Sequence, residues 1–95
     1  IIAGVALAPD RVMRCGIPTY VVDLTIAMTN ITLAATAHGL GTCWIGSFDQ
    51  DEVKKVLQIP EIYKVVALMP LGYPAEKPAA RPRKDLQEVV AWDNF

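Results

Sequence analysis

The stretch from Tyr20 to His38 contains no glycine and no proline, and it constrains the fold of this chain more than any other feature. It predicts one long helix, with Thr19 as the N-cap and Gly39 as the left-handed residue at which helices commonly end. Apolar residues lie nearly all round this helix: Val21, Val22, Leu24, Ile26, Ala27, Met28, Ile31, Leu33, Ala34, Ala35 and Ala37. Because a helix that is apolar on every face is usually buried, we expect it to be covered on all sides.

Short apolar runs elsewhere in the chain predict strands. Ile1 to Leu7 has the length and β-branching of a buried strand, and Val65 to Leu71 has the same character. Pro70 has no N–H to donate to a strand ladder, so it predicts a bulge or a sheet edge there. Gly41 to Gly46 is too short and too rich in glycine for a helix, and it is interpreted as a short strand or extended segment.

Two brief helices complete the pattern. Asp49 and Glu52 have the spacing of a capping box, before the apolar residues Val53, Val56 and Leu57, and Pro60 stops the helix. Tyr73 to Pro82 holds three prolines and predicts a stiff, extended connection. A last short helix is expected over Lys84 to Val90, and Trp92 and Phe95 then follow on a tail with little to pack against.

Composition narrows the classes of partner. At 53% hydrophobic residues, this chain of 95 residues carries more apolar surface than so small a domain usually buries. A partner chain or another part of the same fold is the simplest cover, whereas Asp23, Asn30 and His38 interrupt the apolar stretches that a membrane span requires. The net charge of −1 gives no sign of nucleic-acid binding.

The two cysteines, Cys15 and Cys43, lie far apart and form no CxxC pair. Two free thiols in a reducing cytosol is the simpler interpretation, and it makes the protein cytoplasmic; a single disulfide is the alternative. One histidine and two distant cysteines do not make a metal site, and no glycine-rich phosphate loop is present.

Several landmarks, taken in order, resemble the nitroreductase family. They are Leu33-Ala34-Ala35 with His38 to Phe48 (HGLGTCWIGSF), then Ile59-Pro60, then Val65 to Pro74 ending in Leu71-Gly72-Tyr73-Pro74, and finally Arg81-Pro82-Arg83. The match covers nearly all of the chain but only the C-terminal half of a typical member. We therefore expect residues 1–95 to form the C-terminal half of one nitroreductase-like α/β domain, in which helices sandwich a sheet.

This resemblance implies an FMN-dependent oxidoreductase that uses NAD(P)H and acts as a homodimer. In the family, the segment matching Trp44, Ile45, Gly46 and Ser47 passes the flavin ring, and the positions matching Arg81 and Arg83 approach its phosphate. The resemblance also implies that the long helix lies at the centre of the dimer and that the tail from Ala91 to Phe95 reaches onto the partner. No catalytic side chain is expected, because the flavin itself transfers hydride and electrons.

Each of these residues also has a structural interpretation. Gly46 suits close approach to a flat ring, but it and Gly41 also flank a tight turn. Arg81 and Arg83 would point to the same side of an extended chain and grip a phosphate, or they form a solvated basic loop. Trp44 is equally suited to a core or a dimer interface. For Cys43 a buried, inert thiol is favoured, and for the single histidine a role at the helix end.

Two competing functions stay open. The same scaffold supports dehalogenation, flavin fragmentation and thiazole or oxazole oxidation in relatives, so the acceptor is not fixed by the residues present. The second alternative is a non-catalytic dimerising module, or a truncated fragment that has lost flavin binding. It is motivated by the absence from these 95 residues of the Arg-Xaa-Ser-Xaa-Arg motif that the family carries near its N-terminus.

Overall fold

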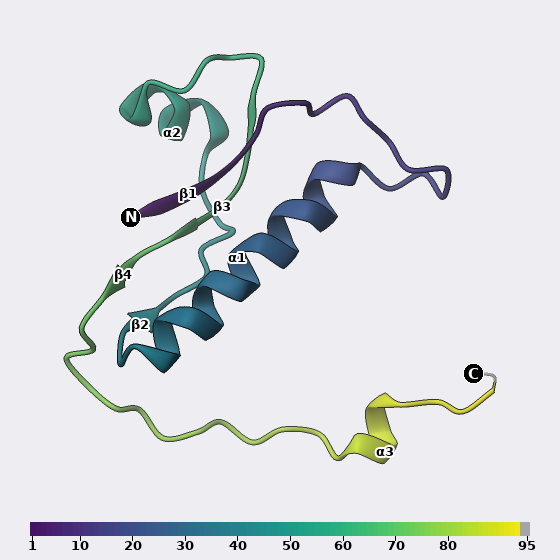
Figure 1. Ribbon diagram of the computed structural model, residues 1–95, viewed down its shortest axis with the longest axis vertical. Helices are drawn as coiled ribbons and strands as arrows, with labels where there is room; N and C mark the ends of the chain where they lie inside the picture. Colours follow the sequence, from purple (N-terminus) through teal and green to yellow (C-terminus); the bar gives the residue numbers. More distant parts are fainter. Residues whose placement is uncertain (94–95) are drawn as a thin grey trace.

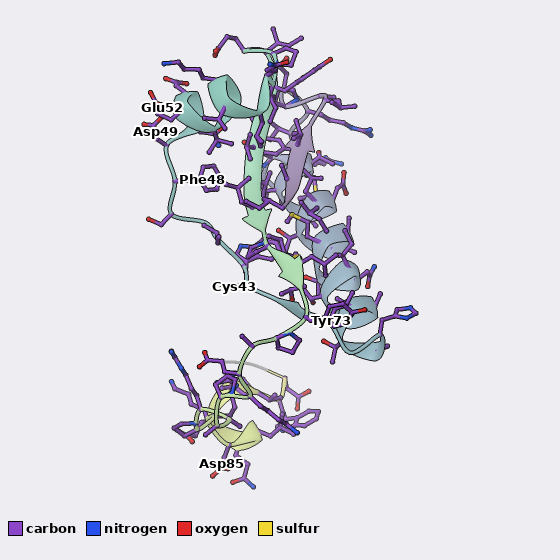
Figure 2. The ribbon with its side chains drawn as sticks, turned by 90° about the vertical axis from the view of Figure 1, so that its left-hand side faces the viewer. Cys43, Phe48, Asp49, Glu52, Tyr73 and Asp85 are labelled. Atoms are coloured by element: carbon purple, nitrogen blue, oxygen red, sulfur yellow. The ribbon has the colours of Figure 1, made fainter. Side chains whose placement is uncertain are left out.

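Strands lie between two helices in the computed structural model of this chain, which describes residues 1–93. Figure 2 shows β1 and β3 in the middle, with α1 on one side and α2 on the other. The elements follow one another as β1 (Ile2–Ala6), α1 (Thr19–Ala37), β2 (Gly41–Thr42), α2 (Gln50–Leu57), β3 (Lys64–Met69), β4 (Leu71–Gly72) and α3 (Leu86–Val89). The predicted α/β class, with a sheet sandwiched by helices, is confirmed.

The strands form two small antiparallel sheets, β1 with β3 and β2 with β4. Pro70 separates β3 from β4, so the break that it predicts is the point at which the chain passes from one sheet to the other. The register between β1 and β3 shifts after the pair Gly4 and Ala67, and the next pair is Val5 and Val65. Val66 is therefore the extra residue of a β-bulge.

Helix α1 agrees closely with its predicted limits but begins differently. It starts at Thr19, the residue expected as its cap, and Pro18 precedes it without a side-chain cap. At the other end, Gly39 adopts the left-handed conformation (φ 71°), and the N–H of Leu40 donates to the Ala35 carbonyl at 2.9 Å. The predicted glycine termination is confirmed, and the predicted threonine cap is wrong.

Within residues 1–93, α1 is buried on one face and not on every face. Only Met28 and Ala35 are buried, while Ile26 and Leu33 on the opposite side are 57% and 65% exposed. The physical reason is that the chain supplies one layer of cover, the β1–β3 sheet. By length and composition α1 would also suffice to cross a membrane, a test that the core helices of soluble proteins pass as well.

A row of threonines follows one side of α1. Each hydroxyl donates to a main-chain carbonyl one turn earlier in the helix: Thr25 to Val21, Thr29 to Thr25, Thr32 to Thr29 and Thr36 to Thr32, at 2.6 to 2.9 Å. This pattern is the usual way in which a threonine satisfies its hydroxyl inside a helix. The four hydroxyl protons are therefore bonded within the helix itself.

The core lies where α1 crosses the β1–β3 sheet. Met28, Ala67 and Met69 are fully enclosed there, and Ile2 and Ile31 pack around them. The Met28 thioether lies directly over Gly4, in space that any side chain at position 4 would need. Glycine at this position allows the helix and the strand to come close together.

Helix α2 starts as the sequence predicts but buries a different residue. The Asp49 carboxylate accepts hydrogen bonds of 2.9 Å from the N–H groups of Asp51 and Glu52, which confirms the N-cap. The Glu52 side chain makes no described bond back to the Asp49 N–H, so the reciprocal half of the predicted capping box is not formed. Val56, expected on the packed face, is 75% exposed. The buried side chain is Lys54, whose ammonium group donates to the Glu61 carbonyl at 3.1 Å.

The C-terminal arm, residues 73–85, contains neither helix nor strand, as its prolines predict. Figure 1 shows it running away from the strands and beneath the C-terminal end of α1 to the single turn of α3. Trp92 is 82% exposed, in agreement with the expectation that it has little to pack against. Phe95, the other aromatic residue expected on this tail, lies outside the described residues.

Candidate functional site

The Trp44–Ser47 segment leaves β2 and runs beside β3 on its way to α2. Ile45 is its point of attachment: its N–H donates to the Leu68 carbonyl at 2.9 Å, and its carbonyl accepts from the Leu68 N–H at 3.0 Å. The segment is thus extended, as predicted, and Ile45 adds one antiparallel bridge along the edge of β3.

The residues around Ile45 are open. Trp44 is 43% exposed, and Gly46 and Ser47 are exposed as well. Apart from its chain neighbours Ile45 and Ser47, no described residue comes within 4 Å of a Cβ placed on Gly46, and the φ of Gly46 is not positive. Packing within the chain therefore does not require glycine at position 46. A small residue there leaves the backbone accessible to a flat ligand.

Gln50 holds the C-terminal end of this stretch to β3, a role that no sequence pattern predicts. Its carboxamide oxygen accepts the Val65 N–H at 3.1 Å, and its amide nitrogen donates to the Val65 carbonyl. The bulge at Val66 lies beside this contact. Sequence gives little signal for such a pairing, because it depends on the local register of β3.

Arg81 and Arg83 lie apart from the Trp44–Ser47 segment. Both are exposed in the C-terminal arm, which Figure 1 shows extending away from β4. No described residue of the strand layer forms a hydrogen bond or an ion pair with either guanidinium. The structure therefore brings together Trp44, Ile45, Gly46 and Ser47, and it does not bring the two arginines to them within one chain.

The remaining candidates have structural positions. His38 is the C-cap of α1 and is exposed. Cys43 carries a free, exposed thiol, so the buried position expected for it is wrong; it follows β2 on a surface that this chain leaves uncovered. Among residues 1–93, no group of three or more side chains of the His, Cys, Asp and Glu type is placed to hold a metal ion.

An apolar hollow of about 250 Å³ lies beneath α2. It is lined by Ile1, Asp49, Glu52, Val53, Val56, Leu57 and Leu68. The hollow shares none of the predicted site residues. Helix α2, which supplies most of its lining, lies on the side of the sheet opposite α1 (Figure 2). The hollow reflects the uncovered apolar face of α2 rather than a part of the candidate site.

Comparisons of sequence and of structure with known proteins all point to the same family. The model of the nitroreductase family matches residues 10–73. An FMN reductase (NADPH) of Bacillus subtilis is 34% identical over 70 residues, which are 72% of this chain and 28% of that protein. The curated relatives are matched over 28% to 45% of their own lengths, so the chain spans less than half of each.

Solved structures agree with the sequence match. A nitroreductase family protein from Clostridium novyi NT superposes with a TM-score of 0.71 at 43% identity, over 76% of this chain and 41% of its own. NADPH:FMN oxidoreductase from Vibrio harveyi, solved in complex with NAD+, gives a TM-score of 0.73 at 33% identity, over 80% and 34% of the two chains. The family model covers more than half of the sequence and the fold agrees with it; the chain belongs to the nitroreductase family.

Proposed function

We propose that this protein is an FMN-dependent oxidoreductase that passes electrons from reduced nicotinamide to a nitroaromatic, quinone or similar acceptor. The observation that carries the proposal is the Trp44–Ser47 segment, held on β3 by Ile45 and open at Gly46. Family membership and relatives named FMN reductase and NADPH:FMN oxidoreductase support it.

FMN would supply the redox chemistry, and the protein would supply position and polar contacts. Gly46 and Ser47 would lie along the ring, because both residues are exposed and, apart from Ile45 and Ser47, no described residue comes within 4 Å of a Cβ placed on Gly46. Trp44 would border the ring with its exposed indole. Main-chain N–H groups held in place beside a ring stabilise negative charge that develops on it, because they need not reorganise.

Arg81 and Arg83 would hold the FMN phosphate. Two guanidinium groups can bind the oxygens of a phosphate dianion through paired hydrogen bonds. Because these arginines lie on an arm that leaves the body of its own chain, we propose that the working protein is a homodimer. The outward face of α1, with Ile26 and Leu33 exposed, supplies apolar surface for such an interface.

The absorbance and fluorescence of FMN, titrated with protein expressed from the complete gene, test this function. Saturable FMN binding with much weaker riboflavin binding is expected, since riboflavin lacks the phosphate. Oxidation of NADH and NADPH is then followed with a nitroaromatic, a quinone and free FMN as acceptors. Assembly without binding of either flavin would favour the alternative, a dimerising module without catalysis.

The cellular setting belongs to the same proposal. Both cysteines carry free thiols, as expected for a protein in the reducing cytoplasm. Fractionation of cells that express the tagged protein would test this location, and enrichment in membrane or secreted fractions would contradict it.

A further inference from the structure

The Gly46–Asp49 loop is fastened to β3 at both ends. At its start, Ile45 and Leu68 exchange two main-chain hydrogen bonds of 2.9 and 3.0 Å. Directly after its end, the Gln50 carboxamide bonds both polar main-chain groups of Val65. The loop therefore projects from β3 between two attachments, each made of a paired donor and acceptor.

The contact of Gln50 reproduces what a neighbouring strand would provide. A carboxamide carries one acceptor and an N–H donor on the same planar group, as a peptide bond does. Val65 is only 2% exposed, and it directly precedes Val66, the bulge residue in the ladder to β1. Its N–H and C=O need partners from the chain, since buried main-chain groups are rarely left without them.

Asp49 ties the loop to the helix that carries Gln50. Its carboxylate caps α2 through the N–H groups of Asp51 and Glu52. The end of the loop and the first turn of α2 are thus one hydrogen-bonded unit. Gln50 is the side chain of that unit that bonds the main chain of β3.

We propose that Gln50 is a positioning residue for flavin binding, acting through the main chain of Gly46 and Ser47. The carboxamide holds the start of α2 to Val65. It thereby fixes the position of the Gly46–Asp49 loop relative to β3, so that the main chain of the loop is in place to contact the flavin ring. That the loop contacts flavin rests on the proposed function, whereas the contact that fixes the loop does not. Polar groups contribute most to binding when the surrounding structure holds them in the bound geometry beforehand.

Gln50→Ala, Gln50→Glu and the control Lys55→Ala are compared in protein expressed from the complete gene. Lys55 is exposed on the same helix, and no side-chain hydrogen bond of Lys55 is found among the described residues. Amide hydrogen exchange of residues 46–49 is measured without flavin, and the dissociation constants of FMN and riboflavin are measured separately. Exchange reports on the loop itself, so it decides the positioning role without reference to activity.

Gln50→Ala should speed amide exchange in the loop. It should also raise the dissociation constants of FMN and riboflavin about tenfold, the scale expected when two hydrogen bonds are lost. Gln50→Glu adds a signature that general destabilisation lacks. Its carboxylate still accepts the Val65 N–H but faces the Val65 carbonyl without a proton to donate. Protection of the loop, corrected for intrinsic exchange, should return toward that of the parent as pH falls and the introduced carboxyl is protonated.

Unchanged exchange of residues 46–49 in Gln50→Ala would overturn the positioning role. Faster exchange with unchanged flavin affinity would overturn the link between this loop and the ring. If the parent protein binds no flavin, the proposed function fails, while the exchange data still decide whether Gln50 fixes the loop. Equal effects of Lys55→Ala would also contradict the proposal.

Discussion

The thioether of Met28 occupies the space that a Cβ on Gly4 would need, which brings α1 and β1 into close contact. Gly4→Ala should therefore destabilise the fold by about 1–3 kcal/mol, the usual cost of overpacking a core. The flexibility of Met28 places the value near the lower end of that range. Urea denaturation followed by circular dichroism measures it.

Gly46→Ala is the matched control for that substitution. Apart from its chain neighbours, no described residue lies within 4 Å of a Cβ at position 46, so the denaturation midpoint should stay close to that of the parent. Equal destabilisation by both substitutions would contradict the close packing of Gly4 against α1.

Lys54 should contribute mainly through its aliphatic stem. It is 3% exposed, whereas the Glu61 carboxylate that it meets at 3.4 Å belongs to a side chain that is 80% exposed. Lys54→Met keeps most of the stem and leaves no buried charge without a partner, so a cost below about 1 kcal/mol is expected. Lys54→Ala removes the stem and should cost about 2 kcal/mol. Similar losses for both variants would show that the polar contacts of the ammonium group with Glu61, and not packing of the stem, are decisive.

Asp49→Ala should destabilise the protein by about 1 kcal/mol, because two N–H groups at the start of α2 lose their acceptor. Asp51 is the second residue of α2. Asp51→Ala should lower the free energy of unfolding by only about a few tenths of a kcal/mol, because only a favourable interaction with the helix dipole is lost. Thermal or urea unfolding of the two variants distinguishes them, and the reverse order would contradict the cap.

Arg81→Ala combined with Arg83→Ala should weaken FMN binding at least about tenfold and leave riboflavin binding unchanged, since charge-assisted bonds to phosphate are lost. The dimer should persist by size-exclusion chromatography with light scattering. Lys77→Ala, a change of another basic residue of the arm, is the control. Equal loss of both flavins would show that the arm acts through folding or assembly and not on the phosphate.

Leu33→Glu should raise the dimer dissociation constant at least about tenfold, because a charge would be placed in an apolar interface. Leu33 is 65% exposed on the outer face of α1. Ile62→Glu, at a residue 71% exposed in the turn after α2, is the control. Analytical ultracentrifugation over a range of concentrations measures both, and an unchanged Leu33→Glu dimer would exclude this face as the interface.

Local patterns predicted much of the fold, because caps, glycines and prolines act on their neighbours. The Gly39 termination, the Asp49 cap and the break at Pro70 all appear where the sequence predicts them. Burial was predicted less well, since it depends on what covers each face. The buried Lys54 and the exposed Val56 depend on tertiary surroundings that the helical period of α2 does not specify.

The candidate site was predicted in part for the same reason. The extended Trp44–Ser47 segment follows from local glycines and from the family resemblance, and the structure places it on β3 through Ile45. The pairing of Gln50 with Val65 lies beside a bulge, and neither leaves a local signal in the sequence. No described residue of the strand layer bonds Arg81 or Arg83, so no local pattern of the sequence indicates where they lie relative to that segment.

The internally bonded threonines of α1 change how this helix meets its surroundings. A hydropathy scale treats the four hydroxyls of that row as polar groups, yet each hydroxyl already donates its proton to a main-chain carbonyl of the same helix. Toward a solvent or a neighbour, the row behaves more like valine than like serine. When nothing covers this face of α1, the chain should self-associate as its concentration rises. Low protein concentration and a mild detergent should then keep it monodisperse better than added salt does.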